Sequence, residues 1–291
     1  MKRCIALAKK AEGFTSPNPM VGALLVKDGK IIAEDYHKKA GTPHAEALVI
    51  GQAGVASRGA TLFVNLEPCC HREKRTPPCT DAIIAAGIKD VFVAMKDPNP
   101  YVAGKGIETL VSAGIATEYG ILQEEAAQLN EAYARYITTR TPFVTMKIAM
   151  TLDGKIATPD GLSKWITCET SRHIVHHLRG SVDAILSAIG TVKADNPLLT
   201  CRIKDKKCPV RIIIDPWMET PAHFNVFQTP PKTIFVTKQV PSPAPAGDIE
   251  FIHYGGNLDL KWLMAELGKR EITSILIEGG SSLTGHAIED G

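Results

Sequence analysis

Four side chains in the N-terminal half have the types and the spacing of a catalytic metal site. One residue separates His44 from Glu46, and two cysteines that each follow a proline, Cys69 and Cys79, lie 25 and 35 residues after the histidine. One imidazole and two thiolates suit Zn²⁺ and leave its fourth tetrahedral position open to water. Bound zinc lowers the pKa of such a water towards ~7, and Glu46 could carry the proton to a leaving group. We therefore predict metal-assisted hydrolysis, with His44, Cys69 and Cys79 as ligands and Glu46 as general acid/base.

The order of these residues is that of zinc deaminases, in which H-x-E precedes P-C and a further cysteine. Cys79 is expected to begin a helix, and the positive end of a helix dipole favours a thiolate. A structural zinc ion would instead need four protein ligands. Cys70 or His71 could supply the fourth, so this alternative stays open.

Longer motifs resemble one family along nearly the whole chain. The segments SPNPMVGALLV, TLFVNLEPCCH, RTPPCTDAIIAAGI and KDPNPYVAGKG are similar to the deaminase domain of the bifunctional riboflavin-biosynthesis deaminase/reductases. The segments KIAMTLDGKIAT, SKWIT, GTVKADNPLLTCR and LIEGGSSL are similar to the reductase domain, in the family's order. The resemblance implies a cytidine-deaminase-like α/β/α domain over residues 1–141 and a dihydrofolate-reductase-like α/β domain over residues 142–291.

The resemblance also implies which residues of the first domain bind a pyrimidine phosphate. Asn18 matches a position whose amide holds the ring, and His37, His71 and Arg75 match positions that hold the ring and the phosphate. The segment between Cys69 and Cys79 has nine residues, one more than is usual in the family. The extra residue can bulge into solvent without moving either ligand.

In the second domain the resemblance implies an NADPH site and a substrate site. The implied cofactor contacts are Ala149, Trp165, Thr191, Asp195, Gly280, Ser281, Ser282, Leu283, Thr284, Gly285 and His286. The implied substrate contacts are Ser163, Arg179, Leu199, Arg202 and Glu278.

Some of these assignments also follow from residue type. Arg179 and Arg202 could hold a phosphomonoester with two parallel hydrogen bonds each, and Glu278 could accept hydrogen bonds from sugar hydroxyls. Backbone N–H groups of the turn at Gly279-Gly280 could approach a pyrophosphate closely. No G-x-G-x-x-G follows a predicted strand, so a Rossmann dinucleotide site is not indicated.

The elements that must position these residues alternate between strands and helices in both halves. In the first half we expect strands at 21–26, 30–36, 60–66, 90–95 and 115–119 and helices at 4–12, 43–53, 79–87, 105–113 and 123–138. Asp28-Gly29 predicts a hairpin between the first two strands. In the second half we expect strands at 143–150, 184–188, 211–215, 233–237 and 274–280 and helices at 169–179, 258–268 and from 283. Such alternation favours a largely parallel sheet with helices on both faces.

Composition excludes several classes of protein. Among 291 residues, 33 basic and 31 acidic side chains give a net charge of +2, which argues against charge-driven binding to nucleic acid or membranes. No run approaches the ~18 apolar residues of a spanning helix. Lys9 and Lys10 fall where a signal peptide would be apolar. We expect a cytoplasmic enzyme that acts on a small molecule, binds neither nucleic acid nor a membrane, and forms a homo-oligomer.

The resemblance makes the expected chemistry specific. The first domain would deaminate 2,5-diamino-6-ribosylamino-4(3H)-pyrimidinone 5′-phosphate with one zinc ion per chain, and the second would reduce the ribosyl side chain to ribityl with NADPH. The alternatives are a zinc deaminase of nucleic acids or nucleosides and a zinc-stabilised binding protein without catalysis. In proteins that the second half resembles, further strands follow SSLTGHAIEDG, so we also expect a shortened reductase domain with an open sheet edge and poor reduction.

Overall fold

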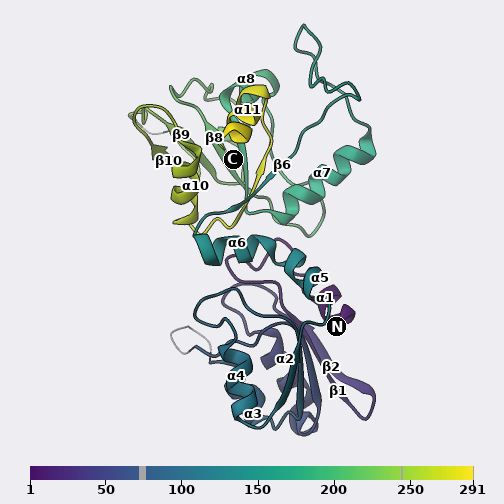
Figure 1. Cartoon of the computed structure of the whole chain (residues 1–291). Coiled ribbons are helices and arrows are strands. Elements are labelled where there is room, and N and C mark those ends of the chain that lie inside the picture. The colour runs from purple at the N-terminus through teal and green to yellow at the C-terminus, as the bar shows by residue number, and fades with distance from the viewer. Residues whose placement is uncertain (72–76, 244, 291) are drawn as a thin grey trace. The chain divides into compact units, whose positions relative to one another are not determined.

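The computed structural model describes residues 1–71, 77–243 and 245–290 (Figure 1). Its chain divides into two compact units, residues 1–140 and 141–291. Each unit has its own sheet and its own core. Within the described residues, no helix combines the length and the apolarity that crossing a lipid bilayer requires.

A five-stranded sheet in the order β2-β1-β3-β4-β5 forms the centre of the first unit. Its strands are β1 (Gly22–Lys27), β2 (Lys30–Tyr36), β3 (Thr61–Leu66), β4 (Asp90–Met95) and β5 (Ala116–Tyr119). Asp28 and Gly29 both have positive φ, as a two-residue hairpin turn requires, so the predicted hairpin is confirmed. The sheet is mixed rather than largely parallel, because β1 runs antiparallel to both β2 and β3. Only β3, β4 and β5 are parallel to one another.

Helices surround this sheet, with one short 3-10 turn at Gly54–Ser57. They are α1 (Lys2–Lys9), α2 (Ala45–Ala53), α3 (Cys79–Ala85), α4 (Lys105–Ser112), α5 (Gln123–Leu129) and α6 (Glu131–Thr139). The backbone of α1 crosses Gly22 so closely that a Cβ there would lie 2.2 Å from the carbonyl oxygen of Cys4. Ala45 and Val49 of α2 belong to the buried core with Leu25 of β1.

The prediction of a single helix over residues 123–138 is wrong, because Asn130 separates two helices, α5 and α6. Asn130 is buried and has non-helical backbone angles (φ −109°, ψ 21°). Its amide oxygen accepts the N–H of Met20 (2.8 Å), and its amide nitrogen donates to the Met20 carbonyl (3.0 Å). Both tertiary hydrogen bonds fix Asn130 outside the helical conformation.

Six parallel strands form the sheet of the second unit in the order β10-β9-β8-β7-β11-β6. They are β6 (Phe143–Met146), β7 (Ala184–Ala188), β8 (Val210–Ile214), β9 (Thr233–Thr237), β10 (Ile249–His253) and β11 (Ser274–Ile277). Strand β10 was not predicted, and β6 and β11 end earlier than expected. The largely parallel arrangement predicted for this half is confirmed.

Helices cover both faces of the second sheet. They are α7 (Glu169–Ser181), α8 (Ile189–Asp195), α9 (Asn225–Gln228), α10 (Leu260–Gly268) and α11 (Ser281–Glu289). Successive strand residues point to opposite faces. Leu186 accordingly packs in one cluster with Leu263 of α10, whereas Ile185 packs in another with Val192 of α8. Helices α8 and α9 were not predicted.

The carboxylate of Asp183, whose side chain is 10% exposed, joins the beginnings of β7 and β11. It accepts hydrogen bonds from the backbone N–H (2.9 Å) and hydroxyl (2.7 Å) of Thr273 and from Lys207 (2.8 Å). Burial acts to raise the pKa of Asp183, but Lys207 and Thr273 outweigh burial and hold this pKa below its usual value. The ionised carboxylate therefore stabilises the folded unit.

Asp183→Asn is expected to destabilise the second unit by about 1–3 kcal/mol at pH 7, since it removes charged hydrogen bonds. Because the folded pKa lies below the unfolded one, this stabilisation is present above about pH 4 and is lost as the pH falls through the folded value. Urea unfolding at pH 7 and below pH 4, followed by tryptophan fluorescence, tests this. The only tryptophans of the chain, Trp165, Trp217 and Trp262, all lie in the second unit, so their fluorescence reports its unfolding. An equal difference between the two proteins at pH 7 and below pH 4 would contradict the assignment.

Candidate active sites

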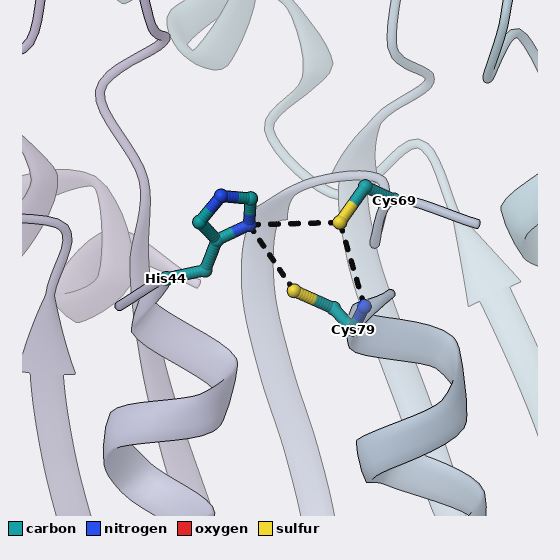
Figure 2. Close-up of side chains that lie close together, drawn as sticks. All are labelled: His44, Cys69 and Cys79. Atoms are coloured by element: carbon teal, nitrogen blue, oxygen red, sulfur yellow. Dashed lines mark hydrogen bonds between the residues drawn. The ribbon is translucent and has the colours of Figure 1, made fainter. Parts of the chain in front are cut away.

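Three sequence-predicted ligands converge at the carboxyl end of β3 (Figure 2). His44 precedes the first residue of α2 in an extended conformation (φ −72°, ψ 160°). Cys69 lies three residues after β3, and Cys79 is the first residue of α3, as predicted. Two helix N-termini and one strand end therefore present an imidazole and two thiols to a common point.

The spacing of the three side chains suits one metal ion. The Nδ1 atom of His44 lies 3.5 Å from Sγ of Cys69 and 3.2 Å from Sγ of Cys79, and all three donor atoms lie within 4.8 Å of one another. The backbone N–H of Cys79 also donates to Sγ of Cys69 (3.4 Å). Among the described residues, no other group of three or more histidine, cysteine or acidic side chains comes together in this way. Cys70 and His71 do not belong to the group, and the donor set fits a zinc ion with an open position.

Glu46 is the second residue of α2 and is buried beside this group. Within the described part of the chain, its Oε2 atom has no hydrogen-bond partner. Burial, and then the neighbouring Cys69, raise the pKa of the Glu46 carboxyl. The site thus contains a proton-carrying group with one oxygen available to water or substrate.

The side chains of His37 and Asn18 lie together, next to the predicted metal ligand His44. The amide nitrogen of Asn18 is 3.1 Å from Nε2 of His37, whose Nδ1 is 3.1 Å from the Pro43 carbonyl. A carbonyl can only accept, so Nδ1 carries the proton and Nε2 accepts from Asn18. Burial lowers the pKa of His37, which favours this neutral form, and its ring centroid lies 5.4 Å from that of His44.

The remaining predicted contacts of this site are placed only in part. The ring of His71 lies 6.4 Å from the ring of Tyr101. Arg75 lies outside the described residues.

Sequence reasoning missed Glu67, a buried carboxylate two residues before Cys69. Its two oxygens accept four backbone N–H groups at 2.9–3.1 Å, those of Asp97, Gly104, Gly106 and Ile107. A Cβ on Gly106 would lie 2.1 Å from the Pro68 carbonyl oxygen, so this loop needs glycine to approach the ligand segment. The available signal was an acidic residue at the end of a buried strand, directly before a predicted ligand.

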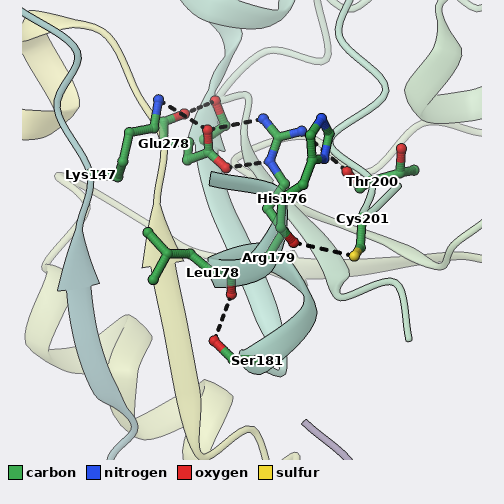
Figure 3. A network of polar contacts seen from close by, with 9 residues as sticks. Lys147, His176, Leu178, Arg179, Ser181, Thr200, Cys201 and Glu278 are labelled. Carbon is green, nitrogen blue, oxygen red and sulfur yellow. Dashed lines mark hydrogen bonds and ion pairs between the residues drawn. The ribbon is translucent and has the colours of Figure 1, made fainter. Parts of the chain in front are cut away.

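Charged side chains of the second unit meet at the carboxyl ends of β6 and β11 (Figure 3). Arg179 donates from Nε and Nη2 to the two oxygens of Glu278 (2.6 and 3.0 Å), and Lys147 lies 3.2 Å from Oε2. Burial acts to raise the pKa of Glu278, but Arg179 and Lys147 hold it below its usual value. Lys147 was not predicted, because the strand expected over residues 143–150 placed it inside the strand, whereas β6 ends at Met146.

The two arginines predicted to bind a phosphate have different surroundings in the structure. The guanidinium of Arg179 is engaged by Glu278 and by the Thr200 carbonyl (3.2 Å), whereas Arg202 is exposed. Burial, and then the charges of Arg179 and Arg202, lower the pKa of His176. Leu199 is buried.

The predicted cofactor residues come from three segments. Gly280 precedes α11 in an extended conformation, and a Cβ there would lie 3.6 Å from the hydroxyl of Thr191. The first turn of α11 therefore presents backbone N–H groups beside Thr191, which suits a pyrophosphate. Asp195 pairs with Lys164 (2.9 Å), and the exposed Trp165 stacks on Arg172. Ala149 and Ser163 lie between β6 and α7, in a segment without helix or strand.

Two family models match the chain. The cytidine and deoxycytidylate deaminase zinc-binding region matches residues 1–95, and the RibD C-terminal domain matches residues 142–291. The riboflavin biosynthesis protein RibD of Aquifex aeolicus is 49% identical, over 96% of this chain and 80% of its own length. The RibD protein of Escherichia coli strain K12 is 41% identical, over 100% and 83%. The chain belongs to the RibD family.

Solved structures agree with this membership of the RibD family. The Thermotoga maritima diaminohydroxyphosphoribosylaminopyrimidine deaminase/5-amino-6-(5-phosphoribosylamino)uracil reductase is 43% identical, with a TM-score of 0.92 over 99% of this chain and 82% of its own. Acinetobacter baumannii RibD is 37% identical, with a TM-score of 0.89 over 100% and 82%. The resemblance seen in the sequence is confirmed. As a RibD-family member, the chain is a riboflavin-biosynthesis enzyme with a zinc deaminase domain and an NADPH-dependent reductase domain.

Proposed function

We propose that residues 1–141 hydrolytically deaminate 2,5-diamino-6-ribosylamino-4(3H)-pyrimidinone 5′-phosphate and that residues 142–291 reduce the product with NADPH to 5-amino-6-(5-phosphoribitylamino)uracil. The observation that carries the first half is the buried Glu46 beside an imidazole and two thiols spaced for one metal ion. The closely similar Thermotoga enzyme bears the names of both activities.

In the deamination step, His44, Cys69 and Cys79 would hold zinc, which supplies a Lewis acid that makes hydroxide available at neutral pH. Glu46 accepts a proton from the attacking water and delivers it to the amine. A C–O bond forms at the ring carbon, the C–N bond breaks, and ammonia leaves. The raised pKa of the buried carboxyl suits a group that must both take and release a proton.

The substrate would be held by the side chains around the metal ligands. Asn18 and His37 are already ordered by their mutual hydrogen bond, so they offer a preformed edge to the pyrimidine ring. His71 and Arg75 are proposed to bind the ring and the phosphate. Orientation by preformed groups reduces the entropy lost in the reaction.

In the reduction step, NADPH supplies the reducing equivalents, and the protein orients it against the sugar. Thr191, Asp195, Ala149 and Trp165 are proposed as cofactor contacts, with the turn from Gly280 to His286 around the pyrophosphate. Glu278 is proposed to bind the ribose hydroxyls while Arg179 and Lys147 keep it ionised. Ser163, Leu199 and Arg202 complete the proposed substrate contacts.

Glu278→Gln is expected to lower the kcat/KM of reduction by roughly 10- to 150-fold. The change removes a buried charge that two cations face, and a charged hydrogen bond contributes about 1.5–3 kcal/mol. Deamination by the same preparation is the control, because Glu278 lies in the other unit. Unchanged reduction would remove Glu278 from the substrate site.

One assay separates this function from its alternatives. The pyrimidine phosphate is offered with and without a metal chelator, and ammonia release is measured. We expect release that the chelator abolishes and added zinc restores. A nucleic-acid or nucleoside deaminase would release ammonia only from its own substrate, and a binding protein would release none.

We further propose that the chain works in the cytoplasm as a homo-oligomer. Support for association comes from exposed apolar side chains in the segment after the edge strand β6, namely Ile148, Met150, Leu152 and Leu162. Sedimentation of the purified protein tests the oligomeric state, and cell fractionation tests the location.

A further inference from the structure

Two histidines on α7 face each other on the surface of the second unit. His173 and His177 are both exposed and lie four residues apart, which places them on one face of the helix. Their ring centroids are 4.8 Å apart at an interplanar angle of 75°, and their Nε2 atoms are 3.2 Å apart. Neither residue has a part in the proposed reactions.

The distance between these nitrogens matches a shared metal ion. Zinc binds imidazole nitrogen at about 2.0–2.1 Å, so two such ligands at a tetrahedral angle are about 3.3 Å apart. We propose that His173 and His177 form a second divalent-metal site, specific for borderline cations that imidazole prefers, such as Zn²⁺, Ni²⁺ or Cu²⁺. When the metal binds, the ring that donates through Nε2 would carry its proton on Nδ1 instead, which frees both Nε2 atoms for the metal.

The proposed site at His173 and His177 differs from the group of His44, Cys69 and Cys79 in metal affinity and in exposure to solvent. Among the described residues, only His44, Cys69 and Cys79 form a group of three possible ligands, so water must complete the coordination at His173 and His177. With two neutral ligands on an exposed face, this ion exchanges with solvent and binds more weakly than the one held by two thiolates.

Occupancy of this site has a local consequence for α7. A metal that joins residues i and i+4 links successive turns of the helix. Arg179, which pairs with Glu278, lies two residues after His177. Metal binding is therefore expected to slow the opening of the turn that leads to Arg179, whereas a simple hydrogen bond between the rings would not depend on metal.

Equilibrium dialysis of the zinc-loaded protein against Ni²⁺ tests the site. We expect the unaltered chain to bind one additional nickel ion. His173→Gln and His177→Gln should each weaken nickel binding by at least about tenfold. Loss of a residue that only orients a metal ligand already lowers metal affinity by about that factor, and loss of a ligand should cost no less. His223→Gln, which removes an exposed histidine outside the pair, is the matched control and should bind nickel normally.

Hydrogen exchange provides the second measurement. Ni²⁺ should slow amide exchange in α7 of the unaltered chain and of the His223→Gln variant, and it should have no effect there in the two pair variants. Tryptophan fluorescence establishes that each variant's second unit is folded. Absence of the additional nickel ion, or equal nickel binding by all variants, would overturn the proposal and leave the pair as a hydrogen bond only.

Discussion

Glu46→Gln is expected to lower deamination by at least ~10²-fold, the usual scale for the loss of a general acid/base. Glutamine keeps the size of the side chain but cannot carry a proton between water and the amine. Zinc should stay at one ion per chain, because the group of ligands does not include Glu46. Ammonia release and metal content are measured on the same preparation.

Two controls make the result specific to Glu46. Glu125→Gln makes the same chemical change on an exposed face of α5 and should leave deamination unaltered. Reduction of pre-deaminated substrate by the Glu46 variant should also be normal, because that site belongs to the second unit. Deamination that survives Glu46→Gln would exclude this carboxyl from the mechanism.

Cys79→Ser is expected to remove most of the zinc and, with it, deamination. Zinc requires the thiolate, and the serine hydroxyl is a poor replacement. Cys79 packs in a small cluster with Cys69 and Val102 and is not part of the main apolar cluster of the first unit, so circular dichroism should still report a folded protein. Metal analysis of the purified variant gives the zinc content.

Cys70→Ser is the matched control, because Cys70 is the next residue after a ligand and lies outside the metal-ligating group. It should keep both zinc and deamination. If Cys70→Ser lost the metal while Cys79→Ser retained it, the ligand set would have to be reassigned.

The convergence of His44, Cys69 and Cys79 could be predicted because these residues lie at the ends of elements with clear local signals. Asp28-Gly29 determines a hairpin by backbone conformation alone, and Pro78 marks the start of the helix that begins at Cys79. Glu67 was missed because its role depends on four backbone groups more than 29 residues away. Such partners are joined by the fold and leave no local pattern.

The charged site of the second unit, at Arg179 and Glu278, was even harder to predict from local sequence. Arg179 and Glu278 are 99 residues apart, and their residue types are equally compatible with binding a phosphate and a sugar separately. Only the folded structure shows that they bind each other, through two hydrogen bonds of 2.6 and 3.0 Å. The single helix predicted over residues 123–138 was wrong for a related reason. The local sequence around Asn130 favours a helix, but the hydrogen bonds of Asn130 to Met20 override that preference.

The strand order of the second unit also determines when its sheet can form during synthesis of the chain. Strand β6 pairs with β11 alone among the described strands, and the first pair in register is Phe143 with Ser274, 131 residues later. At ~5–20 residues per second, a ribosome needs roughly 7–26 s to make the intervening chain. In the first unit a two-residue turn joins β1 to β2, so pairing there can begin almost at once. On a growing chain, deaminase activity is therefore expected to mature before reductase activity, with β6 left unpaired in the interval.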